Sequence, residues 1–180
     1  FVTSNTPSMV WDIGCNTGDY LKVALNAGAT AAIGFDFDQG ALEHAFARAR
    51  EEKLNLTPLF LDATNPAPNQ GWAEEERKGM AARKAADGVM ALAVVHHLAI
   101  TRNIPLDRVV GWLMDMAPVG VIEFVPKQDA MVQELLRLRE DIFPDYTAEC
   151  FLAHIEARGK VVRQQTVSES GRLLVMFENN

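Results

Sequence analysis

The feature that most constrains the fold is a short apolar run followed by a glycine-rich turn and the start of a helix. It is the stretch VWDIGCNTGDYL, residues 10–21. Such a turn lets backbone approach a bound small molecule closely. In open α/β sheets, ligands bind beyond the carboxyl ends of the strands. The stretch therefore predicts a strand–turn–helix unit with a ligand site at its turn.

Further apolar runs alternate with helical segments along the chain. Strands are expected at residues 9–13, 31–36, 56–63, 88–94 and 119–125, and helices at 19–27, 40–54, 73–85, 106–115, 130–140 and 147–158. The run at 88–94 lacks polar alternation, which is typical of a strand buried on both faces of a parallel sheet. Only SESG separates the runs 160–167 and 172–178, so these two must pair antiparallel. We therefore expect an α/β fold with a mostly parallel seven-stranded sheet, helices on both faces and a terminal antiparallel hairpin.

The segments outside these runs suggest one domain. Residues 1–8, FVTSNTPS, are polar and begin without methionine, so we expect a linker or the end of a truncated upstream segment. Residues 9–180 are long enough for a single domain with a proper core. The stretch NPAPNQGW has the composition of a loop, so we expect a loop–helix insertion over residues 65–86.

Composition excludes several classes of protein. The net charge is −7, from 17 basic and 24 acidic side chains, which argues against a protein that binds nucleic acid through its phosphates. Two cysteines, Cys15 and Cys150, are too few for a disulfide framework or a thiolate zinc site. No apolar run approaches the length of a membrane span. We expect a cytoplasmic protein with reduced thiols and without metal, membrane or nucleic-acid partners.

The glycine turn does not match the usual phosphate-binding patterns. A dinucleotide fingerprint counted from Gly14 needs two further glycines, but the chain has Asn16 and Asp19 at those positions. The carboxylate of Asp19 would also face a pyrophosphate. The Gly-Lys-Ser/Thr ending of a nucleotide-binding P-loop is absent. A ligand held by its phosphates is therefore the wrong prediction.

The spacing that fits is Asp-x-Gly-x-Asn-x-Gly, formed by Asp12, Gly14, Asn16 and Gly18. Asn replaces the usual middle glycine, and it is among the few residues that tolerate left-handed backbone. Asp36 ends the next expected strand. A carboxylate at that position suits a bidentate grip on ribose hydroxyls.

At these motifs the chain resembles the class I S-adenosylmethionine-dependent methyltransferases, which have a Rossmann-like fold. Four stretches carry the resemblance in order, each at an expected strand end: VWDIGCNTG, GFDFD, LFLDAT and ALAVVHHL. The terminal hairpin is the usual ending of that family, so the resemblance covers about residues 9–178. The segment NPAPNQGWAEEER lies outside the general pattern and resembles a bacterial, nodulation-related subgroup. The resemblance implies a transferase that methylates a small-molecule acceptor.

The resemblance also implies which residues bind S-adenosylmethionine and its product S-adenosylhomocysteine. They are Asp12, Gly14, Cys15, Asn16, Gly18, Asp36, Phe37, Asp62, Ala63, Ala91 and Leu92. Asp12 would hold the amino group, Asp36 the ribose hydroxyls, and Phe37 would lie against the adenine. Asp62 would accept from the adenine amino group, and Leu92 would approach the methionine moiety. Simpler roles remain open, because Asp12 could cap its turn and Asp62 could begin one.

Two adjacent histidines, His96 and His97, follow the fourth expected strand. One of them could be a general base that takes a proton from a hydroxyl or amine acceptor. Alternatively, they pack or cap at the strand-to-helix turn. Glu123, at the end of the fifth strand, is expected to be a solvated rim residue rather than an acceptor contact. Trp72 and Asn69 would either form a lid or tie the loop down with one buried aromatic side chain.

Two other functions remain open at the level of the sequence. A nicotinamide-dependent oxidoreductase uses a similar sheet, although Asp19 and the missing third glycine argue against it. A non-catalytic module that binds a cofactor or a partner could keep Asp36 and lack an acceptor pocket. Asn16 in place of glycine is the departure that keeps this alternative open. Fold alone does not separate these functions.

Overall fold

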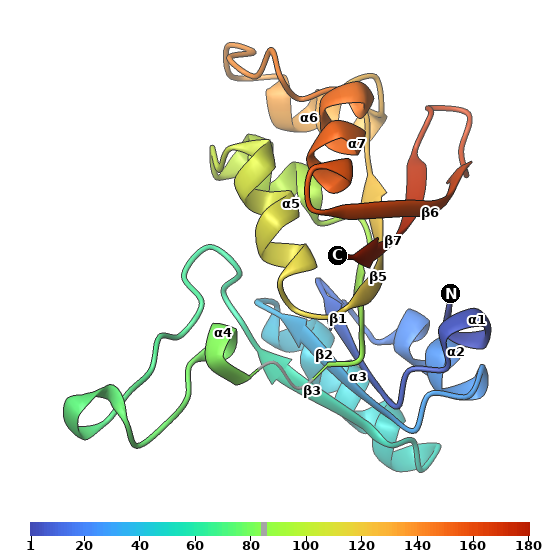
Figure 1. The fold of residues 1–180 in the computed structure, drawn as a ribbon, viewed down its shortest axis with the longest axis vertical. Helices are drawn as coiled ribbons and strands as arrows, with labels where there is room; N and C mark the ends of the chain where they lie inside the picture. Colours follow the sequence, from blue (N-terminus) through green and yellow to red (C-terminus); the bar gives the residue numbers. More distant parts are fainter. Residues whose placement is uncertain (84–85) are drawn as a thin grey trace.

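The computed structural model describes residues 1–83 and 86–180, in which seven strands form one sheet (Figure 1). The strands are β1 Met9–Ile13, β2 Ala31–Asp36, β3 Leu56–Phe60, β4 Gly88–Ala91, β5 Val119–Phe124, β6 Gly159–Thr166 and β7 Leu173–Asn179. Their order across the sheet is β3-β2-β1-β4-β5-β7-β6. Strands β1 to β5 pair in parallel, and β7 is antiparallel to both of its neighbours. The predicted Rossmann-like α/β sheet and its terminal hairpin are confirmed.

Helices connect the strands and cover the sheet. They are α1 Val2–Asn5, α2 Asp19–Asn26, α3 Gln39–Glu51, α4 Met80–Arg83, α5 Leu106–Met114, α6 Ala130–Leu136 and α7 Ala148–Glu156. A 3-10 turn, η1, spans Trp72–Glu74, and a π-helical turn, η2, spans His97–Thr101. None of the helices in the described ranges is long and apolar enough to cross a membrane.

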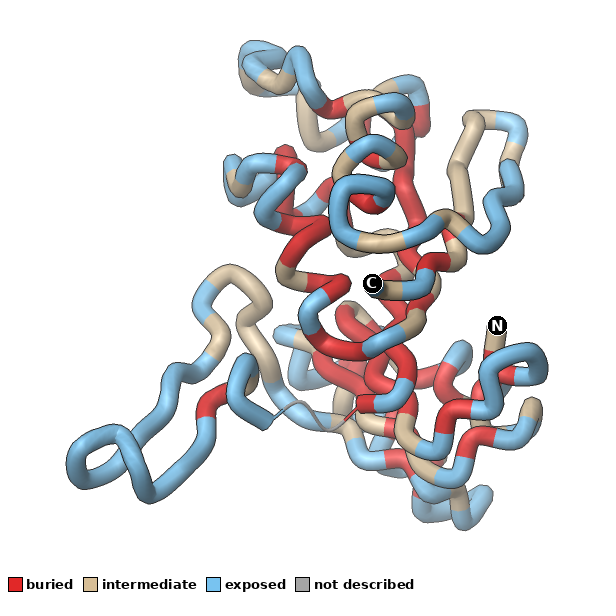
Figure 2. Tube along the Cα trace, viewed as in Figure 1, coloured by how far each residue is buried: buried red, intermediate tan, exposed pale blue. Residues whose placement is uncertain are grey.

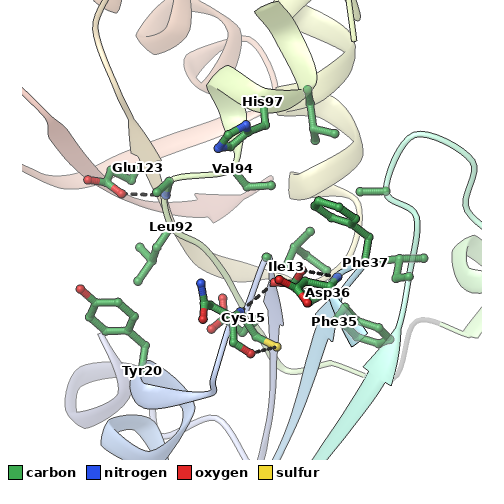
Figure 3. Close-up of a pocket in the computed structure, with 18 of the residues that line it drawn as sticks. Ile13, Cys15, Tyr20, Phe35, Asp36, Phe37, Leu92, Val94, His97 and Glu123 are labelled. Carbon is green, nitrogen blue, oxygen red and sulfur yellow. Dashed lines mark hydrogen bonds between the residues drawn. The ribbon is translucent and has the colours of Figure 1, made fainter. Parts of the chain in front are cut away.

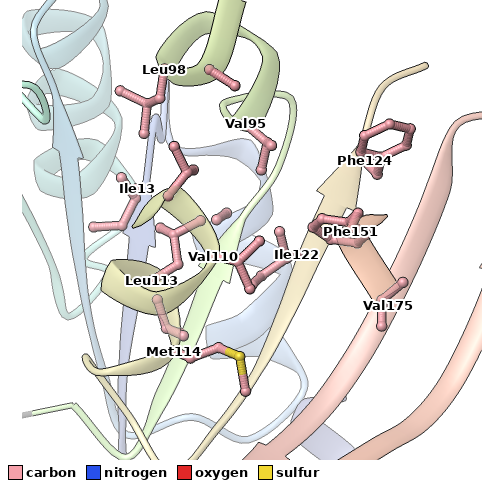
Figure 4. Packing of buried hydrophobic residues seen from close by; sticks show 14 of the residues in the cluster. Ile13, Val95, Leu98, Val110, Leu113, Met114, Ile122, Phe124, Phe151 and Val175 are labelled. Atoms are coloured by element: carbon pink, nitrogen blue, oxygen red, sulfur yellow. The ribbon is translucent and has the colours of Figure 1, made fainter. Parts of the chain in front are cut away.

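The sheet separates two hydrophobic cores, as the alternation along β1 requires. Val10 packs in the core that contains the apolar residues of α2 and α3. Trp11 and Ile13 point the other way, into the core that contains the apolar residues of α5 and α7. Figure 4 shows this second core, in which Leu113 and Phe151 lie near the sheet. Burial on both faces fits the apolar runs of the parallel strands.

Residues 1–8 are not the expected linker. They form α1, and Val2 is buried in the core beside α2. Phe1 lies against the start of β4, where a Cβ added to Gly88 would come within 2.7 Å of the Phe1 ring. The two apolar side chains at this end therefore pack on the domain. Proline and polar residues around them gave the segment the composition of a linker.

The helix expected over residues 73–85 is also wrong. Only η1 and α4 are helical there, Gln70 and Arg77 form an isolated antiparallel bridge, and residues 84–85 lie outside the described residues. Ala73 and Glu74 have left-handed backbone, with φ of 53° and 60°. Residues 67–83 project from the body, and almost all of them are exposed (Figure 2). Helix propensity without an apolar stripe to bury does not suffice to form a stable helix.

Candidate functional site

A cavity of about 1280 Å³ opens beyond the carboxyl ends of strands β1 to β5 (Figure 3). Strands β2 and β3 lie on one side of β1, and β4 and β5 lie on the other, so the direction of the strand order reverses between β1 and β4. Such a reversal leaves a crevice, because the connecting helices leave toward opposite faces of the sheet. The turn after β1 forms the floor of the cavity, and the loop between β6 and β7 forms part of its wall.

The glycine turn has the left-handed backbone that its sequence requires. The φ angles are 78° at Gly14, 49° at Asn16 and 78° at Gly18. Gly14 N and Cys15 N both donate to Phe35 O, at 2.8 and 3.0 Å, so the turn lies directly over β2. The Cys15 thiol is buried, and burial followed by the charge of Asp12 raises its pKa to about 12. It is therefore a packing group rather than a nucleophile.

Asp36 connects the glycine turn to the start of α3. Its Oδ2 accepts a hydrogen bond from Asn16 N at 2.8 Å, and its Oδ1 accepts one from Asp38 N at 3.0 Å. Each carboxylate oxygen has two acceptor sites, so both oxygens keep one for a ligand. Phe37, largely exposed, follows at the same edge of the cavity. The pair can accept from two vicinal hydroxyls and cover one face of a flat ring.

Asp12 is the most unusual group in the cavity. It is 1% exposed, and its Oδ1 has no hydrogen-bond partner among the described residues. Burial, followed by the nearby charge of Asp36, raises the pKa of Asp12 to about 7. A buried oxygen without a partner is costly, so a cation or donor supplied by a ligand would stabilise it.

This pKa predicts how stability depends on pH. Between the unfolded pKa of 3.8 and the folded value of about 7, the folded state binds more protons, so Asp12 lowers stability as pH rises. Asp12→Asn should remove this component, so that the variant gains about 4 kcal/mol of stability over the wild type between pH 4 and pH 8. Urea unfolding of both proteins from pH 4 to 8 measures the difference between their profiles. Parallel profiles would contradict the raised pKa.

Asp62 has the simpler geometry that the sequence left open. Its Oδ1 accepts from Thr64 N at 2.9 Å and from Thr64 Oγ1 at 2.6 Å, and these bonds lower its pKa. Asp62 thus begins a turn while it also lines the cavity beside Ala63. Gly18 and Ala91 do not line the cavity. Gly18 stands at the start of α2, and Ala91 is fully buried in the core.

The two histidines lie in different environments. His97 lines the cavity, whereas His96 is 1% exposed and lies outside the cavity lining. The ring centroids are 4.2 Å apart. Burial lowers the pKa of His96 to about 4. Burial also lowers the pKa of His97, and the charge of Asp36 partly offsets that second shift. Of the two imidazoles, only that of His97 reaches the cavity, while His96 fits the packing alternative.

The cavity also contains residues that the motifs did not indicate. Tyr20, Ser168 and Arg172 line it, and no local pattern in the sequence marks any of them. The expectation of a solvated rim residue is wrong for Glu123, which is 8% exposed and lines the cavity. Its Oε2 accepts from Ala93 N at 2.7 Å. The sequence signal for its place in the cavity was its position at the end of an apolar strand.

The loop before α4 has a different arrangement from either alternative that the sequence left open. Trp72 is 85% exposed, so it does not tie the loop down as a buried aromatic side chain. Asn69 does tie it, because its Oδ1 accepts from Gly79 N at 2.7 Å. Neither side chain is among the residues that line the cavity.

Solved structures of methyltransferases have the same architecture. N-methyltransferase NodS from Bradyrhizobium japonicum WM9, solved with S-adenosylhomocysteine, is similar with a TM-score of 0.68 and 14% identity, over 99% of this chain and 81% of NodS. An rRNA methylase from Escherichia coli is similar with a TM-score of 0.62 and 16% identity, over 99% of this chain and 60% of the methylase. The chain has the class I S-adenosylmethionine-dependent methyltransferase fold. At these identities the likeness shows the fold alone.

The chain is also similar to a curated protein, nodulation protein NoeA from Rhizobium meliloti (strain 1021). It is 49% identical over all 180 residues, and the chain spans 38% of the length of NoeA. The expected resemblance to a bacterial, nodulation-related subgroup is confirmed. No family model matches the chain.

Proposed function

We propose that this domain binds S-adenosylmethionine and transfers its methyl group to a small-molecule acceptor. The observation that carries the proposal is the buried, unpartnered oxygen of Asp12 beside the Asp36 carboxylate at the glycine turn. These two groups fit the cationic amino end and the ribose hydroxyls of that ligand. NodS, which shares the fold, was solved with S-adenosylhomocysteine, and this supports the choice of ligand.

Different residues around the glycine turn would bind different parts of the ligand. The Asp12 carboxylate would accept from the ammonium, which would restore the charge that burial disfavours. The first residues of the turn, Gly14 to Asn16, line the cavity and would bring backbone close to the methionine part. The free acceptor sites of Asp36 would receive the ribose hydroxyls, and the exposed ring of Phe37 would cover the adenine. A pyrophosphate would instead bring two negative charges to these carboxylates, which argues against a nicotinamide cofactor.

Alignment and exclusion of water are the main tasks of the chain. The donor supplies an electrophilic methyl group, so the protein needs to hold the acceptor in line with it. Leu92 and Val94 give the cavity wall apolar surface after β4. The uncharged imidazole of His97 is available to take a proton from an acceptor that must lose one.

The size of the cavity supports a small acceptor. Its volume of about 1280 Å³ exceeds the roughly 300–1,000 Å³ of pockets that hold one drug-sized ligand, so a second small molecule has room beside the donor. The lining contains six carboxylates and two guanidinium groups. An RNA acceptor would bring phosphates toward this acidic lining, which disfavours it.

Calorimetric titration tests the proposal. We expect S-adenosylhomocysteine and S-adenosylmethionine to bind saturably at one site per chain, and NADH to bind at least about tenfold more weakly, because its pyrophosphate meets the carboxylates. Adenosine is the control for binding of the nucleoside part alone. Preferential binding of NADH would support an oxidoreductase, and absence of binding by both sulfur ligands would leave only a module with the methyltransferase fold.

A further inference from the structure

Glu123 and Arg172 line the wall of the cavity opposite Asp36, and the buried Asp129, which is not part of the lining, pairs with Arg172. Arg172 donates to Asp129 through Nε at 2.7 Å and through Nη2 at 3.0 Å. Its Nη1 lies 3.8 Å from Oε1 of Glu123, beyond hydrogen-bond distance. The guanidinium is thus held in bidentate geometry by one carboxylate and reaches the other only electrostatically.

Asp129 has further partners, which hold it in place. Its Oδ1 accepts from Met131 N at the start of α6, and its Oδ2 accepts from Ser170 Oγ at 2.6 Å. These bonds and Arg172 keep its pKa far below the usual range, so Asp129 is charged. Arg172 and Asp129 form a neutral pair. Among these three residues, the negative charge of Glu123 is therefore not compensated by an ion pair of its own.

Glu123 therefore has an incomplete set of partners. Ala93 N donates to its Oε2, whereas its Oε1 receives no hydrogen bond from the described residues. Burial raises the pKa of Glu123, and the hydrogen bond from Ala93 N, followed by the charge of Arg172, offsets this only in part. A buried carboxylate of this kind is stabilised by a cation that donates a hydrogen bond to it. Within the described residues, the guanidinium groups that line the cavity are those of Arg102 and Arg172, and the imidazole of His97 is uncharged because burial lowers its pKa.

The position of Glu123 suits an acceptor better than the donor. Figure 3 shows Glu123, Leu92 and Tyr20 on the side of the cavity away from Asp36 and Phe37. Ala93, which Glu123 holds, has left-handed backbone with φ of 52°, and it follows Leu92 at the end of β4. The carboxylate thus lies beside the loop that the donor's methionine end is expected to approach, and across the cavity from the nucleoside end.

We propose that Glu123 binds the acceptor, and that the acceptor presents a cationic amine to it. The inference rests on the proposed function and adds the chemical class of the second ligand. A carboxylate or phosphate acceptor would face an uncompensated negative charge, which disfavours it. A plain hydroxyl could donate to Oε1, which faces the cavity, but it would not neutralise the charge of Glu123. An ammonium group supplies both the missing positive charge and the hydrogen bond to Oε1.

Three probes of equal chain length separate these classes: n-butylammonium, n-butanol and butyrate. Each is titrated into ¹⁵N-labelled protein saturated with S-adenosylhomocysteine, and chemical shifts report binding. We expect n-butylammonium to bind at least about tenfold more tightly than the other two, as a charge-assisted hydrogen bond predicts. Equal or tighter binding of n-butanol or butyrate would overturn the proposal.

Glu123→Gln removes the charge and keeps a carbonyl that accepts from Ala93 N. It should weaken n-butylammonium binding about tenfold or more, and leave n-butanol and S-adenosylhomocysteine binding within about twofold, which shows that the variant is folded. Glu134→Gln makes the same chemical change on the exposed surface of α6 and should bind every probe as the wild type does.

Two outcomes would overturn the assignment of Glu123 to the acceptor. One is unchanged n-butylammonium binding by Glu123→Gln. The other is weaker binding of S-adenosylmethionine but not of neutral S-adenosylhomocysteine, which would assign the charge to the donor's sulfonium. Failure of S-adenosylhomocysteine to bind the wild type would count against the proposed function instead. The n-butylammonium titration would then be repeated on the protein alone, where Glu123 still faces the cavity.

Discussion

Asp36→Ala is expected to weaken S-adenosylhomocysteine binding about a hundredfold. Two hydrogen bonds from the ligand to a charged carboxylate contribute about 1.5–3 kcal/mol each. Part of this free energy is recovered in the variant, because water binds the ribose hydroxyls instead. The substitution also frees Asn16 N and Asp38 N, which the two carboxylate oxygens hold at 2.8 and 3.0 Å. The glycine turn then loses its link to the start of α3. Calorimetric titration of the variant measures the loss.

Asp36→Asn separates the charge from the geometry. It keeps one carbonyl oxygen as an acceptor and loses the charge, so we expect an intermediate loss of about tenfold. Asp38→Asn is the matched control, because Asn caps a helix as well as Asp does and Asp38 accepts from Gly40 N and Ala41 N at the start of α3. Melting temperatures show whether each variant is folded. Binding by Asp36→Ala within about threefold of the wild type would contradict the assigned role.

The side of the cavity that contains Gly14, Asn16 and Asp36 could be predicted from the sequence, because these residues lie in short local motifs. The backbone of Gly14, Asn16 and Gly18 follows from residue types that tolerate left-handed φ angles, and Asp36 follows from its place at a strand end. Each motif needs only a strand and the turn that follows it. The alternation of apolar runs and helical segments then brings the strand ends to one edge.

The opposite wall could not be predicted in this way, because it depends on the strand order. Leu173 pairs with Phe124 in the antiparallel ladder between β5 and β7, which places Arg172 beyond the carboxyl end of β5. Arg172 lies 43 positions from Asp129 in the sequence. A hairpin predicted from SESG does not indicate which of its strands joins the sheet, so the cluster around Glu123 has no local signature.

The histidines illustrate a second limit. Which of His96 and His97 faces the cavity depends on the turn that follows β4, and η2 begins at His97 as a π-helical turn. The usual 3.6-residue period does not apply there. The strand expected over residues 88–94 ends at Ala91, because Ala93 has left-handed backbone that no apolar pattern marks. At the site, hydrogen bonds and backbone turns override the secondary structure that the local sequence favours.

The fold around Glu123 depends on the residue that follows it. Phe124 is 1% exposed, and its ring centroid lies 4.8 Å from that of Tyr146 and 5.2 Å from that of Phe151. Figure 4 shows Phe124 beside Phe151. Tyr146 donates its hydroxyl hydrogen to Val125 O at 2.8 Å, so the aromatic cluster also fixes the chain beyond β5. Phe124→Ala should lower the free energy of unfolding by about 3–5 kcal/mol, since it removes buried area and leaves a cavity.

Phe124→Leu keeps most of the volume and should cost about 1–1.5 kcal/mol. Phe46→Ala is the matched control, because Phe46 is 55% exposed on α3 and its ring contacts the guanidinium of Arg50 at 5.8 Å. Its truncation should cost no more than about 1 kcal/mol. Urea unfolding of the three variants gives the comparison. A cost for Phe124→Ala close to that for Phe46→Ala would mean that the aromatic cluster does not hold the end of β5. The position of Glu123 would then depend only on its bond to Ala93 and its charge interaction with Arg172.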